Sequence, residues 1–284
     1  MGVLATRLRS GTAWEVPASV QPPTYEAFQH YTRGNEHWIE DRYLEAADRS
    51  LQAYRADTTF LRSLLVGTAA FIQAGETETV DSLFRVIQPR RQELAPYDQY
   101  RLDYGLAGWE GDLAAQLRAA RAGVELVPGG TLHLALVGAL RSNNRPREAL
   151  ENLESIWEGI QEVFPDWTAL WSMNTELHHL LGQHERELEM ARRGRQLRPQ
   201  ALPILVFEGR ALAALGRMDE LDQVLDQIMA GSVGSGMREG LALEELAREL
   251  RAHGHGIKAE AVIRAALTWF DQRPVESKIS PDGF

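Results

Sequence analysis

Five of the eight histidines stand in two groups, and histidine is the side chain most suited to bind a metal or transfer a proton near neutral pH. One group is His178, His179 and His184, and the other is His253 and His255. Metal ligands on one face of a helix are spaced three or four residues apart, as in H-E-x-x-H. Here His178 and His179 are one residue apart, and His184 follows them by six and five residues. His253 and His255 are two residues apart. Adjacent histidines therefore point in different directions, and His184 lies beyond a turn. The sequence therefore predicts no metal site.

No motif of a catalytic centre occurs in the sequence. The G-x-S-x-G, P-loop and G-x-G-x-x-G patterns are absent, and Gly234-Ser-Gly236 follows no expected strand. The chain contains no cysteine, which excludes thiol catalysis, disulfides and thiolate zinc sites. The paired carboxylates Glu244 and Glu245 are typical of a solvated helix face. We therefore expect a protein that is not an enzyme and has no cofactor.

The charge balance limits the classes of partner. The 284 residues include 40 Asp and Glu against 30 Lys and Arg, a formal net charge of −10, whereas nucleic-acid binding requires a basic surface. The tightest basic run, Arg192, Arg193 and Arg195, falls at the end of an expected helix, where cations complement the helix dipole. Residues 1–14 lack the apolar core of a secretory signal. No apolar run approaches the roughly 18–20 residues of a membrane span. These features predict a cytoplasmic protein that binds neither nucleic acid nor membrane.

Usage of the two basic residue types bears on the source of the chain. Only Lys258 and Lys278 are lysines among the 30 basic residues. We interpret this bias as that of a GC-rich, bacterial genome.

Seven short turns recur along the chain at a nearly constant step. Each has a small or polar residue at its centre, and the steps between centres are 34, 36, 33, 38, 34 and 38. Glycine and asparagine end helices well because they tolerate the left-handed conformation. The sequence therefore predicts a helix on each side of every centre. The centres are Asp41, Gly75, Gly111, Asn144, Gly182, Gly216 and Gly254.

Small and apolar residues recur at fixed offsets after each turn centre, and offsets of five, nine and twelve trace one face of a helix. We expect this face to pack on neighbouring helices. At offset five stand Ala46, Val80, Gln116, Ala149, Glu187, Leu221 and Ala259. At offset twelve stand Ala53, Ile87, Gly123, Ile156, Gly194, Ile228 and Ala266.

The period resembles that of the tetratricopeptide repeat, a 34-residue helix–turn–helix. Two stretches carry the resemblance best: Tyr31-Thr-Arg-Gly34 followed by Tyr43-Leu-Glu-Ala46 and Ala53, and Trp171-Ser-Met-Asn174-Thr175-Glu-Leu-His178 followed by Gly182, Ala191 and Pro199. Gln116 and Glu187 depart from the family's small residue. The resemblance implies an all-α superhelix, or solenoid, of about seven repeats with a concave inner face. An irregular helical bundle is the alternative.

The expected array covers 24–275, between an extended, proline-containing lead at 1–23 and a polar tail at 276–284. Trp157–Trp167 lengthens the fourth repeat, and Gly231–Gly236 inserts a flexible link before the last one. The expected repeats are 27–60, 61–96, 97–129, 130–167, 168–201, 202–239 and 240–273.

A second resemblance concerns only the first sixty residues. Leu4–Leu8, Gln21–Phe28 and Tyr31–Gly34 are similar to a junction in bacterial signalling proteins, where a kinase or winged-helix domain precedes a tetratricopeptide tail. It implies that the chain is a C-terminal portion or a shortened relative of such a protein. No kinase or helix-turn-helix pattern occurs here, so neither activity is carried over.

In the tetratricopeptide family the first helix of each pair lines the concave groove. The helix register then predicts a groove in which arginines outnumber acids and aromatic side chains stand at one end. Forked guanidinium groups bind carboxylates well, so such a groove would suit an acidic peptide. The opposite interpretation is that these arginines pair with acids of the array itself. The candidate groove residues are Tyr31, Asn35, Trp38, Arg62, Leu65, Arg101, Arg141, Arg210 and Arg248.

These patterns predict a protein-interaction module that holds an acidic and hydrophobic protein or peptide segment, in bacterial signalling or regulation. The alternative is a structural, self-assembling scaffold whose groove is filled by its own N-terminal lead or by a partner domain. The sequence does not predict the oligomeric state.

Overall fold

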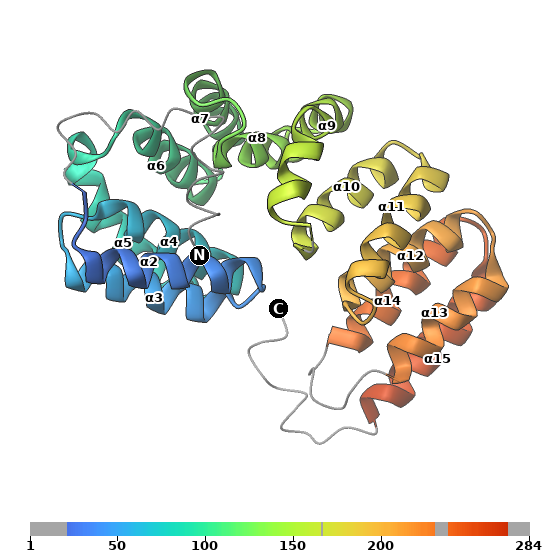
Figure 1. The fold of residues 1–284 in the computed structure, drawn as a ribbon. Coiled ribbons are helices and arrows are strands. Elements are labelled where there is room, and N and C mark those ends of the chain that lie inside the picture. The colour runs from blue at the N-terminus through green and yellow to red at the C-terminus, as the bar shows by residue number, and fades with distance from the viewer. Residues whose placement is uncertain (1–21, 166, 231–237, 272–284) are drawn as a thin grey trace. The chain divides into compact units, whose positions relative to one another are not determined.

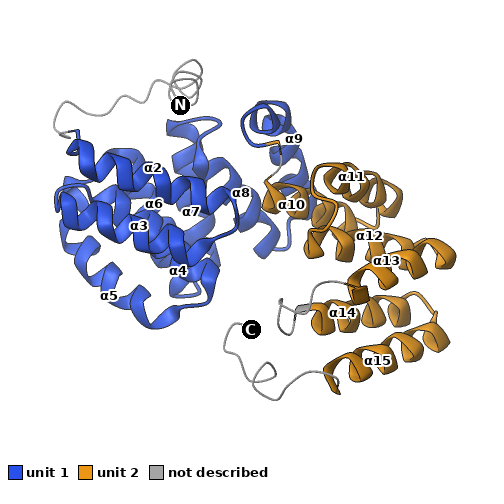
Figure 2. Cartoon of the chain, turned by 60° about the horizontal axis from the view of Figure 1, so that its bottom comes forward, with its two compact units in different colours: residues 1–164 blue, residues 165–284 orange. Residues whose placement is uncertain are grey.

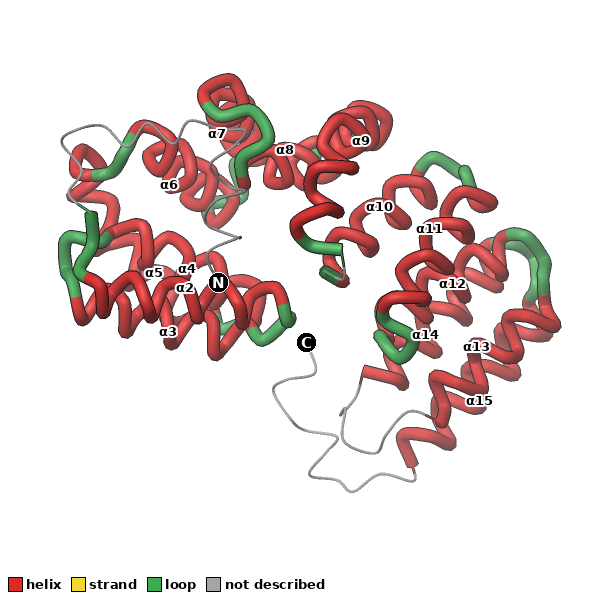
Figure 3. Tube along the Cα trace, viewed as in Figure 1, coloured by secondary structure: helices red, strands yellow, loops and turns green. Residues whose placement is uncertain are grey.

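The computed structural model describes residues 22–165, 167–230 and 238–271, and within these ranges the chain is helical without strands (Figures 1 and 3). None of the described helices combines the length and apolar composition that crossing a bilayer requires. One short 3-10 helix, η1 (Gln88–Glu93), follows α5. The described α-helices are α2 (Tyr25–Ile39), α3 (Tyr43–Ala56), α4 (Leu61–Ala74), α5 (Thr77–Ile87), α6 (Pro96–Trp109), α7 (Leu113–Leu126), α8 (Thr131–Ser142), α9 (Pro146–Val163), α10 (Thr168–Leu180), α11 (His184–Leu197), α12 (Leu202–Ala214), α13 (Met218–Ala230), α14 (Arg238–Ala252) and α15 (Gly256–Asp271).

The helices form two compact units, residues 1–164 and 165–284 (Figure 2). Unit 1 holds four helix pairs, from α2–α3 to α8–α9, and unit 2 holds three, from α10–α11 to α14–α15. Seven pairs agree with the repeat count expected from the turns. That 24–275 forms one continuous array stays a prediction.

All seven turn centres have the left-handed backbone conformation that the sequence predicts. Their φ angles run from 56° at Asn144 to 84° at Gly254, and Asp41 and Asn144 are the non-glycine members. After each centre, the next residue donates its backbone N–H to the carbonyl five residues earlier, as from Glu76 to Phe71 at 3.0 Å. This bond satisfies a carbonyl that would otherwise end the helix unpaired, so each turn is a complete helix cap.

The face at offsets five, nine and twelve forms the core of the repeats. At offset five, Ala46, Val80, Ala149, Leu221 and Ala259 are fully buried. Gly123 and Gly194 at offset twelve let neighbouring helices approach: an added Cβ would lie 2.0 Å from Leu132 Cδ1 and 3.2 Å from Ile204 Cδ1. Burial of this apolar face is the main stabilisation of each pair.

The two residues that depart from the family at offset five are accommodated differently. A Cβ on Gly108 would lie 2.4 Å from Gln116 Nε2, so the glycine on the first helix makes room for the larger side chain on the second. In the first repeat the sizes are reversed, because the large Trp38 packs against the cluster that contains Ala46. The side chain of Glu187 is 0% exposed and contacts His179 across the turn.

Two sequence expectations concern the longer repeats. α9 is the longest described helix at 18 residues, which agrees with the lengthened fourth repeat, and it ends before Phe164-Pro165. The link Gly231–Gly236 lies outside the described residues, as do most of the lead at 1–23 and the whole tail at 276–284.

Candidate functional site

In unit 1, a buried carboxylate joins two of the predicted groove arginines. Asp98 on α6 is 3% exposed. Its Oδ2 accepts a hydrogen bond from Arg62 Nε on α4 at 2.7 Å, and its Oδ1 accepts one from Arg101 Nη1 at 3.4 Å. The structure therefore places Arg62 and Arg101 on one face, with Asp98 shared between them.

Aromatic side chains lie beside this ion pair. Tyr31 on α2 packs edge-on against Phe60, with ring centroids 5.1 Å apart, and the Tyr31 hydroxyl interacts electrostatically with Arg101. Burial of the Arg101 guanidinium opposes its charge, but Asp98, Tyr31 and Tyr97 together outweigh this and raise the pKa of Arg101 above its ordinary value. Arg101 is thus held as a cation on this face.

Arg141 is exposed and lies on α8, the first helix of the next pair. Burial raises the pKa of the Tyr104 hydroxyl on α6, and the charge of nearby Arg141 counteracts that rise. We call Tyr31, Arg62, Asp98, Arg101 and Arg141 the arginine face. It carries three cations against one carboxylate.

Two of the predicted groove residues, Leu65 and Trp38, pack against core clusters. Leu65 is 6% exposed and packs in the cluster of α4, α5 and α6, which leaves little of its side chain accessible; that it contacts a ligand stays a prediction. Trp38 is half-buried against Tyr43 and the Ala46 cluster, and its neighbour Asn35 is also half-buried.

In unit 2 the predicted groove arginines have acidic neighbours. Arg210 on α12 donates to Glu245 Oε1 at 3.2 Å, lies 3.9 Å from Glu187 Oε1 and stacks on Phe207. Arg248 is 70% exposed and lies 3.6 Å from Glu244, one turn earlier on α14. Both agree with the interpretation in which arginines pair with acids of the array.

The basic run on α11 is also paired with acids. Glu208 on α12 is 4% exposed, and its two carboxylate oxygens accept hydrogen bonds from Arg192 and Arg195. Arg193 pairs with Glu189, one turn earlier on its own helix. This run therefore joins α11 to α12 rather than forming an open cationic surface.

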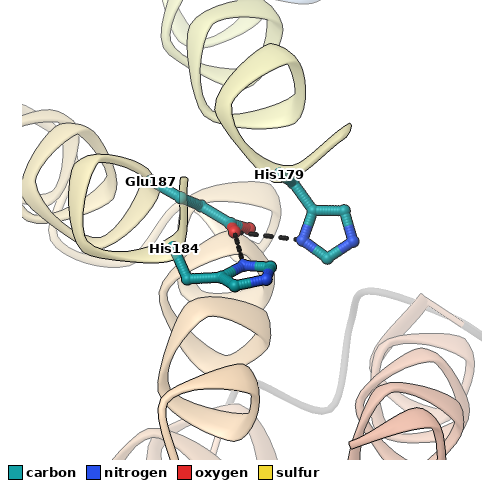
Figure 4. A group of neighbouring side chains, drawn as sticks. All are labelled: His179, His184 and Glu187. Atoms are coloured by element: carbon teal, nitrogen blue, oxygen red, sulfur yellow. Dashed lines mark hydrogen bonds and ion pairs between the residues drawn. The ribbon is translucent and has the colours of Figure 1, made fainter. Parts of the chain in front are cut away.

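Histidines that the sequence analysis separated come together in unit 2 (Figure 4). Glu187 Oε2 lies 3.0 Å from His179 Nδ1 and 3.1 Å from His184 Nδ1, and the ligand atoms of the three residues all lie within 4.8 Å of one another. His178 points elsewhere, toward Gln183. The spacing argument considered one helix face and so did not predict this contact, because the turn brings the end of α10 against the start of α11. The expectation of no metal site stays a prediction.

Sequence reasoning missed this cluster, although one signal could have indicated it. His179 stands three residues before the turn centre Gly182 and Glu187 five residues after it. The same offsets relate Gly108 to Gln116, which are in contact. A polar pair at these two offsets predicts a contact across the turn.

Comparison with known proteins yields similarity of fold. No protein-family model and no curated protein matches the chain. A chain of the APC/C hetero-tetramer Cut9–Hcn1 aligns with a TM-score of 0.52 and 12% identity over 85% of this chain and 43% of that one. The thermophilic tetratricopeptide-repeat protein TTC0263 of Thermus thermophilus gives 0.49 and 15% over 66% and 98%. The crystal structure of MamA gives 0.47 and 13% over 60% and 95%.

Identities this low are evidence about the fold alone. Seven helix pairs, each capped by a left-handed turn centre at a step near 34 residues, are the features of that fold seen in this chain. The chain has an all-α fold of the tetratricopeptide-repeat type.

Proposed function

We propose that the protein is a non-catalytic protein-interaction module that binds an acidic segment of another protein on the arginine face of unit 1. The observation that carries this proposal is the sharing of Asp98 between Arg62 and Arg101. One buried carboxylate holds both guanidinium groups in place and leaves the face net positive, although the whole chain has a formal charge of −10.

A fixed guanidinium group is a better carboxylate receptor than a mobile one, because little side-chain entropy is lost when the ligand binds. The side chains of Arg62 and Arg101 are 20% and 19% exposed, so both reach the surface. Tyr31 beside them offers an aromatic surface for an apolar side chain of the same segment. A segment with alternating acidic and apolar residues would suit this face.

The setting we propose is bacterial signalling or regulation in the cytoplasm, with a soluble protein partner. Its support is the lysine-poor composition and the similarity of residues 1–60 to a junction in bacterial signalling proteins.

The alternative is a self-assembling scaffold in which the lead at 1–23 covers the face. Within 1–23, Arg7 and Arg9 stand against one acid, Glu15, so the lead is itself net basic. A basic lead is a poor match for a positive face, and this favours a separate acidic partner.

The test is affinity capture of partners from a lysate of the source organism. Arg101→Gln/Arg141→Gln removes two charges from the face without placing a new carboxylate beside Asp98. The matched control, Arg193→Gln/Arg264→Gln, removes two charges in unit 2, where these side chains are 57% and 73% exposed. Circular dichroism verifies that all three proteins fold.

A partner retained by the wild type and the control, but lost by the face variant, would support the proposal. Equal retention by all three proteins would contradict it. Self-association of the wild type that the face variant abolishes, measured by light scattering, would favour the scaffold instead.

A further inference from the structure

Three histidines and two glutamates of unit 2 converge where α10, α11 and α14 meet. His179 lies near the end of α10, His184 begins α11, and Glu187 lies one turn further along α11. Glu249 lies near the end of α14, and His253 follows that helix. The rings of His179 and His253 each pack edge-on against His184, with centroids 5.4 and 5.3 Å away.

Glu187 is the unusual member of this group because its carboxylate is fully buried at a core position. Every other described residue at that position in the repeats is apolar apart from Gln116. Among the described residues, Oε1 of Glu187 makes no hydrogen bond and lies 3.9 Å from Arg210 Nε. Burying a carboxylate is costly unless cations or strong donors compensate it. Arg210 faces Oε1, so a cation bound at Oε2 would complete that compensation.

The ligand atoms are arranged as a small cation requires. Nδ1 of His179 and Nδ1 of His184 lie 3.0 and 3.1 Å from the same oxygen, Glu187 Oε2. Tetrahedral zinc with bonds of about 2.0–2.1 Å places neighbouring ligand atoms about 3.3 Å apart. Only small side-chain movements are therefore needed to place one ion between the three atoms (Figure 4).

The surroundings hold two of these ligands in position. His179 Nε2 faces Glu249 Oε2 at 3.8 Å, and Glu249 Oε1 in turn lies 2.8 Å from His253 Nε2. A carboxylate behind the second ring nitrogen is the usual partner of a metal-bound histidine, because it fixes the ring orientation. Arg210 lies on the Oε1 side of Glu187, so Oε2 is the oxygen that faces the histidines.

We propose that unit 2 binds one zinc-like divalent transition-metal ion through His179 Nδ1, His184 Nδ1 and Glu187 Oε2, with Glu249 and His253 as positioning residues. Two imidazole nitrogens with one carboxylate oxygen suit zinc, cobalt or nickel, whereas calcium and magnesium prefer ligand sets made of oxygen alone. Water takes the remaining coordination position. The ion would cross-link α10 to α11 across the turn at Gly182.

The experiment uses the full chain, freed of any purification tag and stripped with a chelator. Zinc titration by calorimetry and visible absorption of bound cobalt measure stoichiometry, affinity and geometry. We expect one ion per chain, the cobalt bands of a tetrahedral nitrogen–oxygen site, and a higher melting temperature with zinc.

Glu187→Gln keeps the shape of the side chain and removes its charge, and Glu185→Gln makes the same change on the exposed residue two positions earlier. Glu249→Gln should weaken zinc binding by roughly 10–100-fold, as loss of an outer carboxylate does, and Glu187→Gln by more. His184→Asn changes a side chain that is 19% exposed at the first position of α11, so it tests a ligand without disturbing the core.

Loss of zinc binding in Glu187→Gln and His184→Asn, with full binding in Glu185→Gln, would establish the site. A wild-type protein that binds no zinc or cobalt would overturn the proposal, and so would unchanged zinc binding in His184→Asn.

Discussion

His179 Nδ1 lies 3.0 Å from the Oε2 atom of Glu187, eight residues later, at positions where the other repeats bring a first helix against a second. In the next repeat the residue that corresponds to Glu187 is Leu221, which is fully buried. One repeat thus contains a polar contact where its neighbour contains an apolar one. The proposed metal site would account for this difference.

Replacing Glu187 with leucine and its ion-pair partner Arg210 with methionine should leave the metal-free protein equally stable or more stable. Both side chains are then replaced by apolar ones of similar volume, and such replacements of a whole buried pair are neutral or stabilising by about 1–4 kcal/mol. A charge placed at the corresponding apolar position, Leu221→Glu, should lower the free energy of unfolding by about 3 kcal/mol or more. Urea unfolding in the presence of a chelator measures both. A marked loss of stability in the double variant would mean that the histidine contacts themselves stabilise the fold.

Two glycine-to-alanine changes should have opposite effects. Gly254 has φ of 84° at a turn centre, so Gly254→Ala should destabilise the protein by about 1–2 kcal/mol although no atom would clash. Gly159 lies within α9 with open space around it, so Gly159→Ala should add about 0.5–1 kcal/mol. Thermal melts of the two variants provide the comparison. Equal effects on the melting temperature would show that the positive φ at Gly254 does not disfavour a residue with a Cβ.

The buried carboxylate of Glu208 should contribute strongly to the stability of unit 2. Glu208→Gln removes the negative charge shared by Arg192 and Arg195, and we expect a loss of about 1–3 kcal/mol because the arginines remain partly exposed. Glu189 on α11 is 35% exposed and pairs with arginines at the surface, so Glu189→Gln should cost much less stability than Glu208→Gln. Chemical denaturation measures the free energy of unfolding of both variants. A similar small loss in both would contradict a strong contribution of the Glu208 carboxylate to stability.

Asp57 should make stability depend on pH in the acidic range. Hydrogen bonds from Thr59 and from the Thr24 backbone N–H lower the pKa of Asp57 below its ordinary value. A lowered pKa stabilises the fold above the ordinary value, and this stabilisation is lost as pH falls through the lowered pKa. Asp57→Asn should therefore cost about 1 kcal/mol or less at pH 7. The difference from wild type should shrink below about pH 4, and a constant difference in stability across pH 3 to 7 would argue against an ionised Asp57.

The seven turns were predictable because backbone sterics act locally. Gly75 or Asn144 at a helix end needs no information from the rest of the chain to adopt positive φ. The small residues at offsets five and twelve were predictable for a related reason, since each repeat must pack on the next in the same way. The fold therefore follows from features that recur.

The contacts between side chains were less predictable because they depend on residues that occur in one repeat and not in the others. Helix register placed Arg62 and Arg101 on one face, but it did not show that Asp98 is buried between them. Helix register also predicted that Leu65 faces the groove, but packing with α5 and α6 buries its side chain. Glu249 and His253 come from a helix pair two repeats after His179, and no local spacing links them.

Two repeats divide the space between their helices in opposite ways: Trp38 on the first helix faces the cluster of the small Ala46, whereas Gly108 on the first helix faces the large Gln116. This matching limits which helices of the chain can be exchanged between repeats. A second helix with glutamine at offset five would collide with a first helix that carries tryptophan, and one with alanine would leave a void opposite glycine. Single helices are therefore not interchangeable between these repeats. A whole hairpin carries its own matched pair, so the hairpin is the smallest segment that duplication or grafting can move intact.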